Sequence, residues 1–181
     1  MTRITDLDDP RWMKLFTDLR SSWFRLETLQ HYSVDYEADE YVQFEQTGTI
    51  DRPFGEWQNM IVRHASQGRR LQRVHVIEHP RSSYLDYEVE AYKINARAGE
   101  DIRIIETAAG EWPEGLPRGY DFWLFDDVDT WAMEYSPDGE FVAAQRVDDS
   151  SALARHRQWR DRALALATPL TKYVDKTPTY Q

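Results

Sequence analysis

The 181-residue sequence contains no cysteine. A chain without thiols cannot form disulfides, cysteine-ligated zinc sites or iron–sulfur clusters, and it cannot use thiol catalysis. It also lacks any apolar run near the roughly 20 residues that cross a bilayer. The first residues are polar and acidic, without the basic and then apolar pattern of a secretory leader. We therefore expect a cytoplasmic globular protein that does not enter a membrane.

The motifs of common catalytic and nucleotide-binding sites are missing as well. The sequence has no G-x-S-x-G, no G-x-G-x-x-G and no glycine-rich phosphate loop. It also has no basic and aromatic stripe of the RNA-binding kind. These absences argue against an enzyme without excluding one, and they leave no catalytic residue, metal or cofactor to predict.

Positive charge is in short supply, because 22 Lys and Arg face 32 Asp and Glu, a net charge of −10. An acidic chain repels phosphates, so direct nucleic-acid binding is not expected. Acidic residues concentrate in 82–150, whereas 51–81 and 151–181 are basic. The two basic segments either pair with the acidic segment or meet as a patch that faces an anion.

Hydrophobic spacing predicts three helices first and a sheet afterwards. Apolar residues recur at helical intervals up to residue 68, and short β-branched and aromatic runs follow. The segment 23–26 can also be extended. The predicted helices are 10–20, 33–47, 56–67, 83–98 and 150–167, and the predicted strands are 73–78, 101–107, 122–125, 130–135 and 140–147.

We expect an α+β, sandwich-like fold from this order. A mixed sheet of about five strands would carry helices on both faces and an N-terminal helical cap. Residues 1–181 would form one domain, with a helical part at 1–68. Residues 69–175 would hold a strand–helix–strand unit, a three-stranded meander and a closing helix. The predicted helix N-caps are Asp9, Ser33, Ser82 or Ser83, and Asp149 or Ser150, and Thr168-Pro169 should break the last helix.

Two histidines, a carboxylate cluster and a tryptophan deserve a chemical interpretation. The run from His75 to His79 spells H-x-x-E-H, but a β-branched strand would separate the two rings by about 13 Å, so no metal is predicted. Asp126 and Asp127 follow an apolar strand and form either an ordinary turn or a Mg²⁺ or acid–base site. Trp112 stands in a Pro/Gly-rich loop, where it could contact a ligand or partner.

The basic residues offer one candidate anion site. Arg69, Arg70 and Arg73 lie between a predicted helix and a strand, and the last helix could add basic partners. Solvated or ion-paired surface is the alternative. The candidate ligand-binding residues are Arg69, Arg70, Arg73, Arg157, Arg160, Asp126, Asp127 and Trp112.

Several short motifs resemble a family of actinobacterial proteins known only as a domain of unknown function. They are FRLE at 24–27, GRR at 68–70, GEDIR at 99–103, FWLFDD at 122–127 and R-x-W-R-D at 157–161. The resemblance spans about residues 23–174. Genes of this family often stand beside helix-turn-helix regulators of the XRE type. The resemblance implies a regulatory or protein-interaction role, and it carries over no catalytic residue.

The strand and helix order also resembles one half of a phospholipase D-type fold. Enzymes of that superfamily use H-x-K before a strand, where this chain has Arg118-Gly119-Tyr120-Asp121. The resemblance therefore implies a degenerate site.

Three hypotheses follow. The first is a non-enzymatic regulatory or interaction module, with a helix-turn-helix regulator as its protein partner. The second is a small-anion binder or phosphoester-acting enzyme, and the third is direct nucleic-acid binding.

Overall fold

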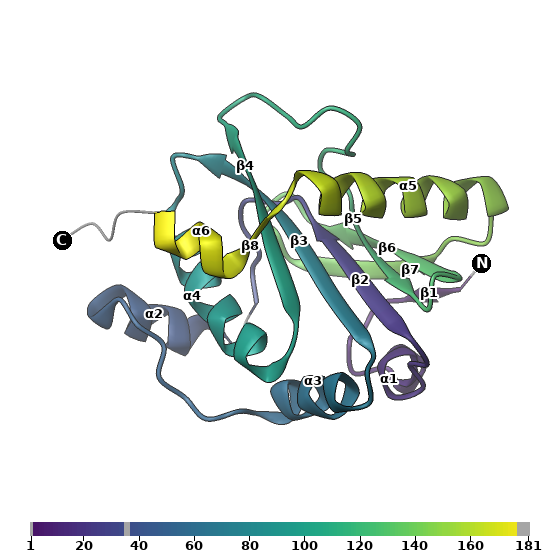
Figure 1. The fold of residues 1–181 in the computed structure, drawn as a ribbon, viewed down its shortest axis with the longest axis horizontal. Helices are drawn as coiled ribbons and strands as arrows, with labels where there is room; N and C mark the ends of the chain where they lie inside the picture. Colours follow the sequence, from purple (N-terminus) through teal and green to yellow (C-terminus); the bar gives the residue numbers. More distant parts are fainter. Residues whose placement is uncertain (1, 35–36, 177–181) are drawn as a thin grey trace.

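A computed structural model describes residues 2–34 and 37–176 of the chain. They form one mixed sheet of eight strands in the order β1-β7-β6-β5-β2-β3-β4-β8, together with six helices (Figure 1). The predicted α+β class and mixed sheet are confirmed, whereas the expectation of about five strands is wrong. The helices are α1 (Pro10–Thr17), α2 (Ala38–Thr47), α3 (Glu56–Ser66), α4 (Ser83–Ala98), α5 (Ser150–Leu166) and α6 (Leu170–Lys176). The strands are β1 (Arg3–Ile4), β2 (Ser22–Glu27), β3 (Arg70–His79), β4 (Asp101–Ala108), β5 (Asp121–Phe125), β6 (Asp129–Tyr135), β7 (Phe141–Arg146) and β8 (Thr168–Pro169).

The first part of the chain is not a helical cap. Strand β2 lies in the middle of the sheet, parallel to β3 on one side and antiparallel to β5 on the other. Its side chains are buried on both faces, which hides the polar and apolar alternation of a half-exposed strand. β1 and β8 have two residues each, too short to show any period. These three strands are the ones missing from the expected sheet.

Helices cover both faces of the sheet. On one face, which we call face A, α1 and α3 pack on Trp23, Trp123 and Trp131. Farther along face A, α4 and α6 pack on Ile102 and Ile104 of β4. On the opposite face, face B, α5 packs on an apolar layer formed by β2, β3 and β5. Face A therefore has two apolar regions.

Most predicted helix ends agree with the structure, and two do not. The first helix was expected to reach residue 20, but α1 ends at Thr17. The Asp9 side chain accepts from the Arg11 amide at 2.8 Å, and the Asp149 side chain accepts from the amides of Ser151 and Ala152. Ser33, however, does not begin α2. It forms a bridge to Glu140, and α2 begins at Ala38 after Glu37. Glycine closes α2 as predicted, since Gly48 adopts a left-handed conformation with φ 71°.

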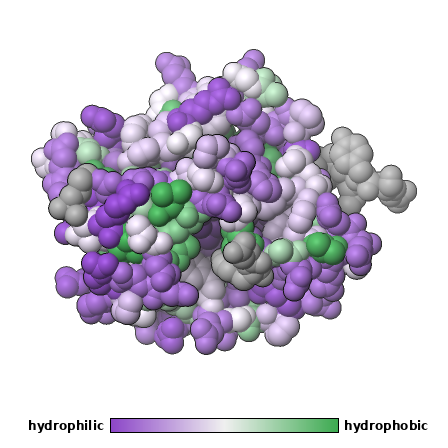
Figure 2. All heavy atoms as spheres, turned by 180° about the vertical axis from the view of Figure 1, so that it is seen from behind, coloured by the Kyte–Doolittle hydropathy of each residue, from purple (hydrophilic) through white to green (hydrophobic). Residues whose placement is uncertain are grey.

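The described residues contain no helix long and apolar enough to span a bilayer. Figure 2 shows that the face opposite the view of Figure 1 is mostly hydrophilic, with small hydrophobic groups near a hollow at its centre. Exposed large apolar side chains are scattered over the described surface: Leu7, Met13, Val42, Phe54, Val62, Val128, Val142 and Leu166. They come from almost every part of the chain.

Candidate functional site: a buried charge network beside a cavity

A network of charged side chains lies on face A under α4. It starts on β2, where Arg25 and Glu27 are two residues apart and so point to the same face of the sheet. The Glu27 carboxylate lies 2.8 Å from Arg25 Nη2 and accepts from Arg73 Nη1 of β3 at 3.1 Å. Arg73 Nε then donates to Glu100 at 3.2 Å, just before β4. The ion pairs therefore cross three adjacent strands.

These ion pairs are shielded from solvent. The side chains of Glu27 and Glu100 are 3% and 0% exposed, and that of Arg73 is 7% exposed. Burial by itself would raise the pKa of Glu27, but the guanidinium groups of Arg25 and Arg73 outweigh burial and hold that pKa at about 2. Glu27 is therefore ionised, and the network depends on it as the shared partner of both arginines.

Helix α4 adds a hydroxyl that touches three acceptor groups. Tyr92 Oη lies 2.6 Å from Glu27 Oε2, 2.8 Å from Glu88 Oε2 and 2.8 Å from His75 Nδ1. His75 Nε2 lies 2.8 Å from the Leu29 carbonyl oxygen and therefore donates its hydrogen there. Tyr92 has a single hydrogen, so the other contacts are hydrogen bonds only if those groups hold protons themselves.

Glu88 is the natural holder of such a proton. Burial, followed by the negative charge of Glu27, raises the pKa of Glu88 above its ordinary value. Glu88 Oε1 also accepts from the Tyr84 hydroxyl at 3.0 Å, so both of its oxygens have partners. A second buried carboxyl, Asp121 of β5, accepts from the Thr28 amide and from the Tyr32 hydroxyl at 2.7 and 2.6 Å. Burial raises the pKa of Asp121 too.

Glu27, His75 and Glu88 offer one metal-ligand atom each, all within 4.8 Å of one another. The other histidine of the H-x-x-E-H string, His79, pairs with Glu106 instead. The ligand set does not suit a divalent cation, because two arginines already contact or border Glu27 and Tyr92 stands among the three atoms. The cluster therefore suits proton sharing better than metal binding.

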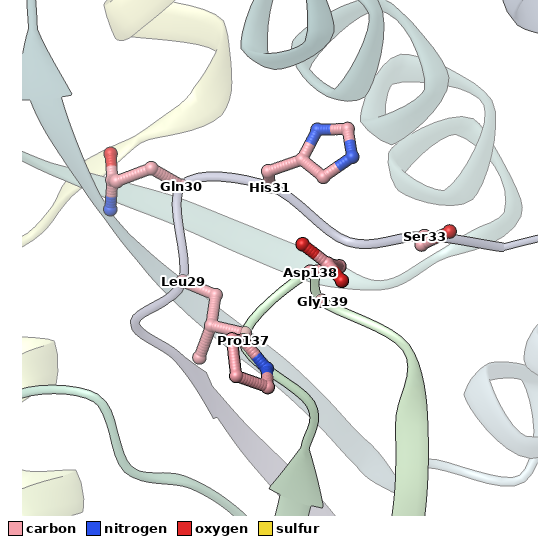
Figure 3. A pocket seen from close by; sticks show the side chains of 7 residues that line it. All are labelled: Leu29, Gln30, His31, Ser33, Pro137, Asp138 and Gly139. Atoms are coloured by element: carbon pink, nitrogen blue, oxygen red, sulfur yellow. The ribbon is translucent and has the colours of Figure 1, made fainter.

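A cavity of about 600 Å³ opens at the carboxyl end of β2. Figure 3 shows its two walls, the segment that follows β2 and the turn between β6 and β7. The two walls approach each other closely. A Cβ added at Gly139 would lie only 2.6 Å from the His31 carbonyl oxygen, so only glycine fits there. The His31 ring lies 4.4 Å from the Tyr84 ring. The lining residues are Leu29, Gln30, His31, Ser33, Pro137, Asp138 and Gly139.

This cavity does not resemble a hydrolase centre. His31, Ser33 and Asp138 all line it, yet no hydrogen bond joins these three side chains among the described residues. The backbone amide of Ser33 instead donates to the Gly139 carbonyl oxygen at 3.0 Å. A serine nucleophile needs a base within hydrogen-bond reach, which these residues do not provide.

The basic candidates separate into three places in the structure. Arg70, Arg157 and Arg160 converge on Asp127, which lies in the turn between β5 and β6. Arg70 is 3.9 Å from the Asp127 carboxylate, Arg160 contacts that carboxylate, and Arg157 Nε donates to the Asp127 backbone oxygen at 2.7 Å. Arg73 belongs to the buried network instead. Arg69 contacts His64 and joins neither group.

Asp126 is occupied by backbone amides. It accepts from the amides of Arg20, Ser21 and Ser22 at 3.1, 2.7 and 3.1 Å, which positions the start of β2. These bonds outweigh burial and lower the pKa of Asp126. Asp126 and Asp127 both have positive φ, 52° and 61°, which Asp tolerates better than most residues. Both aspartates therefore shape a turn.

Trp112 is held against its own loop. Its indole Nε1 donates to the Pro117 carbonyl oxygen at 3.0 Å, and the Arg118 guanidinium lies 5.4 Å from the ring. Trp112 also lines a second cavity of about 440 Å³, together with Arg162 and Leu166 of α5.

Apart from Arg73, the residues of the buried network were missed as candidates, although a signal for them was present. Arg25 and Glu27 belong to the FRLE motif and Glu100 to GEDIR, two segments that carried the family resemblance. Alternate charged residues on a strand ordinarily indicate a solvent face. Here the charged face is covered by α4, so residue spacing alone would wrongly predict that this face is exposed to solvent.

Comparison of the sequence with known protein families agrees with the expected family. A family described as a domain of unknown function (DUF6879) matches residues 10–175. No curated protein matches the chain. The match includes all of the network and every candidate residue discussed above.

Proposed function

Because the chain belongs to the DUF6879 family, whose description assigns no activity, we propose its function from the geometry: a non-enzymatic module that regulates by binding another protein. The observation that carries this proposal is that the charged candidate residues are bound to other groups of the same chain. The Asp126 carboxylate accepts from three amides, the Asp127 carboxylate faces two arginines, and Arg73 pairs with two glutamates. Each of these charges is therefore already paired within the chain.

The partner we propose is a helix-turn-helix regulator in the cytoplasm of an actinobacterium. The motifs that carried the family resemblance support this choice, as does the net charge of −10. DNA-binding regulators present basic surfaces, so an acidic module has complementary charge. Such a module acts on gene expression through the regulator and needs no contact with DNA.

The test is copurification of the tagged full-length chain from its native cells, followed by crosslinking and mass spectrometry. We expect one stoichiometric partner whose complex weakens as salt rises, because complementary surface charges are screened. Purification of the chain alone at every growth stage would overturn the proposal.

A second candidate, a small-anion binder or phosphoester-acting enzyme, rests on the convergence of Arg70, Arg157 and Arg160. An anion there would compete with the Asp127 carboxylate. Removing that charge with Asp127→Asn should therefore strengthen phosphate binding, measured as a rise in Tm with added phosphate. An equal Tm response in wild type and variant would exclude this candidate.

A further inference from the structure

β8 closes the outer edge of β4 only in part. It pairs with Arg103 and Ile104 alone, and no other strand lies on that side of β4 in the described part of the chain (Figure 1). Residues 105–108 therefore pair with β3 on their inner side and with no strand on their outer side. A strand edge of this kind presents N–H and C=O groups that can pair with another chain.

Glu106 is the residue of this edge that is best placed to receive a strand. Pro169 has no N–H, so the backbone groups of Ile104, which lies opposite Thr168, are the ones directed towards β8. Successive residues of a strand direct these groups to opposite edges. Glu106 lies two residues after Ile104, so its N–H and C=O face the same side, beyond the end of β8.

An open cavity of about 440 Å³ lies against this edge, and we call it the β4 groove. One of its walls is the end of α5, with Arg162 and Leu166, and the other is the loop after β4. That loop is held in place by two bonds to its carbonyl oxygens. The Thr107 hydroxyl donates to Glu111 at 3.1 Å, and Arg162 Nε donates to Glu114 at 3.1 Å. The groove is therefore already formed beside the unpaired edge.

The charge of the β4 groove indicates what occupies it. Glu106, Glu111 and Glu114 line it, against the guanidinium of Arg162. The carboxylates of Glu111 and Glu114 make no ion pair among the described residues, and Glu106 pairs with the half-exposed His79. We propose that the β4 groove binds an extended, basic segment of a partner protein, which adds to the sheet as a strand beside Glu106.

A second copy of this chain is a poorer occupant. Two β4 edges paired with each other would bring acidic side chains of both copies together, and like charges that face each other across strands are destabilising. Charged side chains on an edge strand ordinarily prevent such self-pairing. The same charges attract a strand that carries arginine or lysine, so they discriminate between the two occupants.

The two faces of the sheet favour an alternating sequence in the added strand. Ile105 packs on face B together with Trp112, and Leu166, which is 39% exposed, lines the groove there. Ile104 packs on face A, so the side chain of Glu106 points to face A as well. A residue opposite Glu106 should therefore be basic, and its two neighbours, which enter the groove towards Leu166, should be apolar.

This inference rests on the proposed protein-binding function, and it specifies how the partner docks. Main-chain hydrogen bonds supply affinity in strand addition, and alternate side chains supply specificity. A shallow, open groove beside a sheet edge is sufficient for this mode of binding.

The experiment measures binding of the full chain to a labelled, capped Arg-Val-Arg-Val-Arg peptide by fluorescence anisotropy. Two further peptides carry backbone N-methyl groups, one on its arginines and the other on its valines. Only one of these sets faces β4, so one methylated peptide should bind about tenfold more weakly and the other should bind like the parent. This comparison changes only the peptide, so it does not depend on the folding of a variant.

The charge preference is measured with an uncharged peptide, in which citrulline replaces arginine, and with Glu106→Lys. The citrulline peptide should bind about tenfold more weakly than the arginine peptide. Glu106→Lys should weaken the arginine peptide about fivefold, because a repulsive cross-strand pair replaces an attractive one. Glu45→Lys makes the same change of charge on the exposed face of α2 and should leave binding unchanged.

Several results would overturn the proposal. Strand addition is wrong if the parent peptide does not bind or if both methylated peptides bind equally. A basic occupant is wrong if the citrulline peptide binds as tightly as the arginine peptide, and the β4 groove is wrong if Glu106→Lys binds like wild type. If light scattering shows that the chain alone is a dimer that the peptide splits into monomers, the occupant is a second copy.

Copurification separates this inference from the proposed function. A partner that is recovered equally with wild type and with Glu106→Lys would overturn the docking edge and leave the interaction role standing. Peptides that bind as expected, with no partner recovered from cells, would support the β4 groove and overturn the interaction role.

Discussion

At the scale of single residues, the most consequential side chain is Glu27. It is the shared partner of Arg25 and Arg73 and the acceptor of the Tyr92 hydroxyl. A buried ion pair is poor evidence of net stabilisation, since desolvation offsets much of the attraction. Removing Glu27 is different, because Arg25 loses its ion pair and Arg73 keeps only Glu100 as a buried partner.

Glu27→Gln should therefore destabilise the fold strongly. We expect a loss of about 3–5 kcal/mol in the free energy of unfolding, because the buried Arg25 and Arg73 lose their common counterion. Urea denaturation followed by tryptophan fluorescence measures this loss. The control is Glu106→Gln, whose side chain is 51% exposed and pairs with the half-exposed His79. Equal midpoints for the two variants would contradict the prediction.

Glu37 should make stability depend on pH. Its pKa is about 7 in the folded chain against an ordinary 4.5, so folding takes up a proton between these values. The stabilisation is fully present below pH 4.5 and is lost as pH rises through 7. Glu37→Gln should match wild type near pH 4 and exceed it by about 1–3 kcal/mol at pH 8.

Denaturant titrations at both pH values check this, with Glu45→Gln as the charge-matched control. Parallel pH profiles for wild type and Glu37→Gln would show that Glu37 does not titrate in this way.

The site itself was only partly predictable from residues. Convergence of Arg70 and Arg160 on Asp127 could be anticipated from charge patterning, although their partner is an acid of the same chain. The network around Arg25 and Glu27 could not, because its position depends on which face α4 covers. Local spacing reports that two residues share a face and does not report what lies against it.

At the scale of elements, α5 depends on Asp149, the capping residue just before it. The Asp149 carboxylate accepts from the amides of Ser151 and Ala152, two of the helix's unpaired donors. Asp149→Ala should cost about 1 kcal/mol. Asp148→Ala is the matched control, because the Asp148 side chain is 54% exposed and its ion pair with Arg146 is long, at 3.6 Å. Thermal unfolding distinguishes the two, and equal losses would contradict the capping role.

Helices were easier to predict than strands. The helical pattern of α1 spans enough residues for its apolar positions to repeat, and its cap is visible in the sequence. By contrast, β1 and β8 are strands only because they pair with segments far away in the sequence. Ile4 lies beside Ala144, and Thr168 lies beside Ile104. No local signal predicts a pairing of that kind.

At the scale of the whole molecule, both edges of the sheet are closed by short strands. β8 and α6 cover the outer side of β4, where Leu170 and Tyr173 are 4% and 2% exposed. Ending the chain at Ala167 should uncover this apolar surface and the edge backbone of β4. Exposed apolar surface and an unpaired strand edge both promote association between chains. Light scattering and denaturation should show aggregation and loss of cooperative unfolding.

Leu166→Ala serves as the control for that truncation, because Leu166 is 39% exposed and lies at the end of α5. A shortened chain that stays monomeric and unfolds as sharply as wild type would show that β8 and α6 are dispensable.

The strand order also constrains when the protein can mature on the ribosome. β1 is synthesised early but cannot pair until Ala144 of β7 has been made. The outer edge of β4 likewise stays unpaired until Thr168 of β8 has been made. A sheet that joins distant segments folds slowly, because long loops must close before contacts reward them. We therefore expect the nascent chain to expose unpaired strand edges until these later segments are made, a state that chaperones recognise.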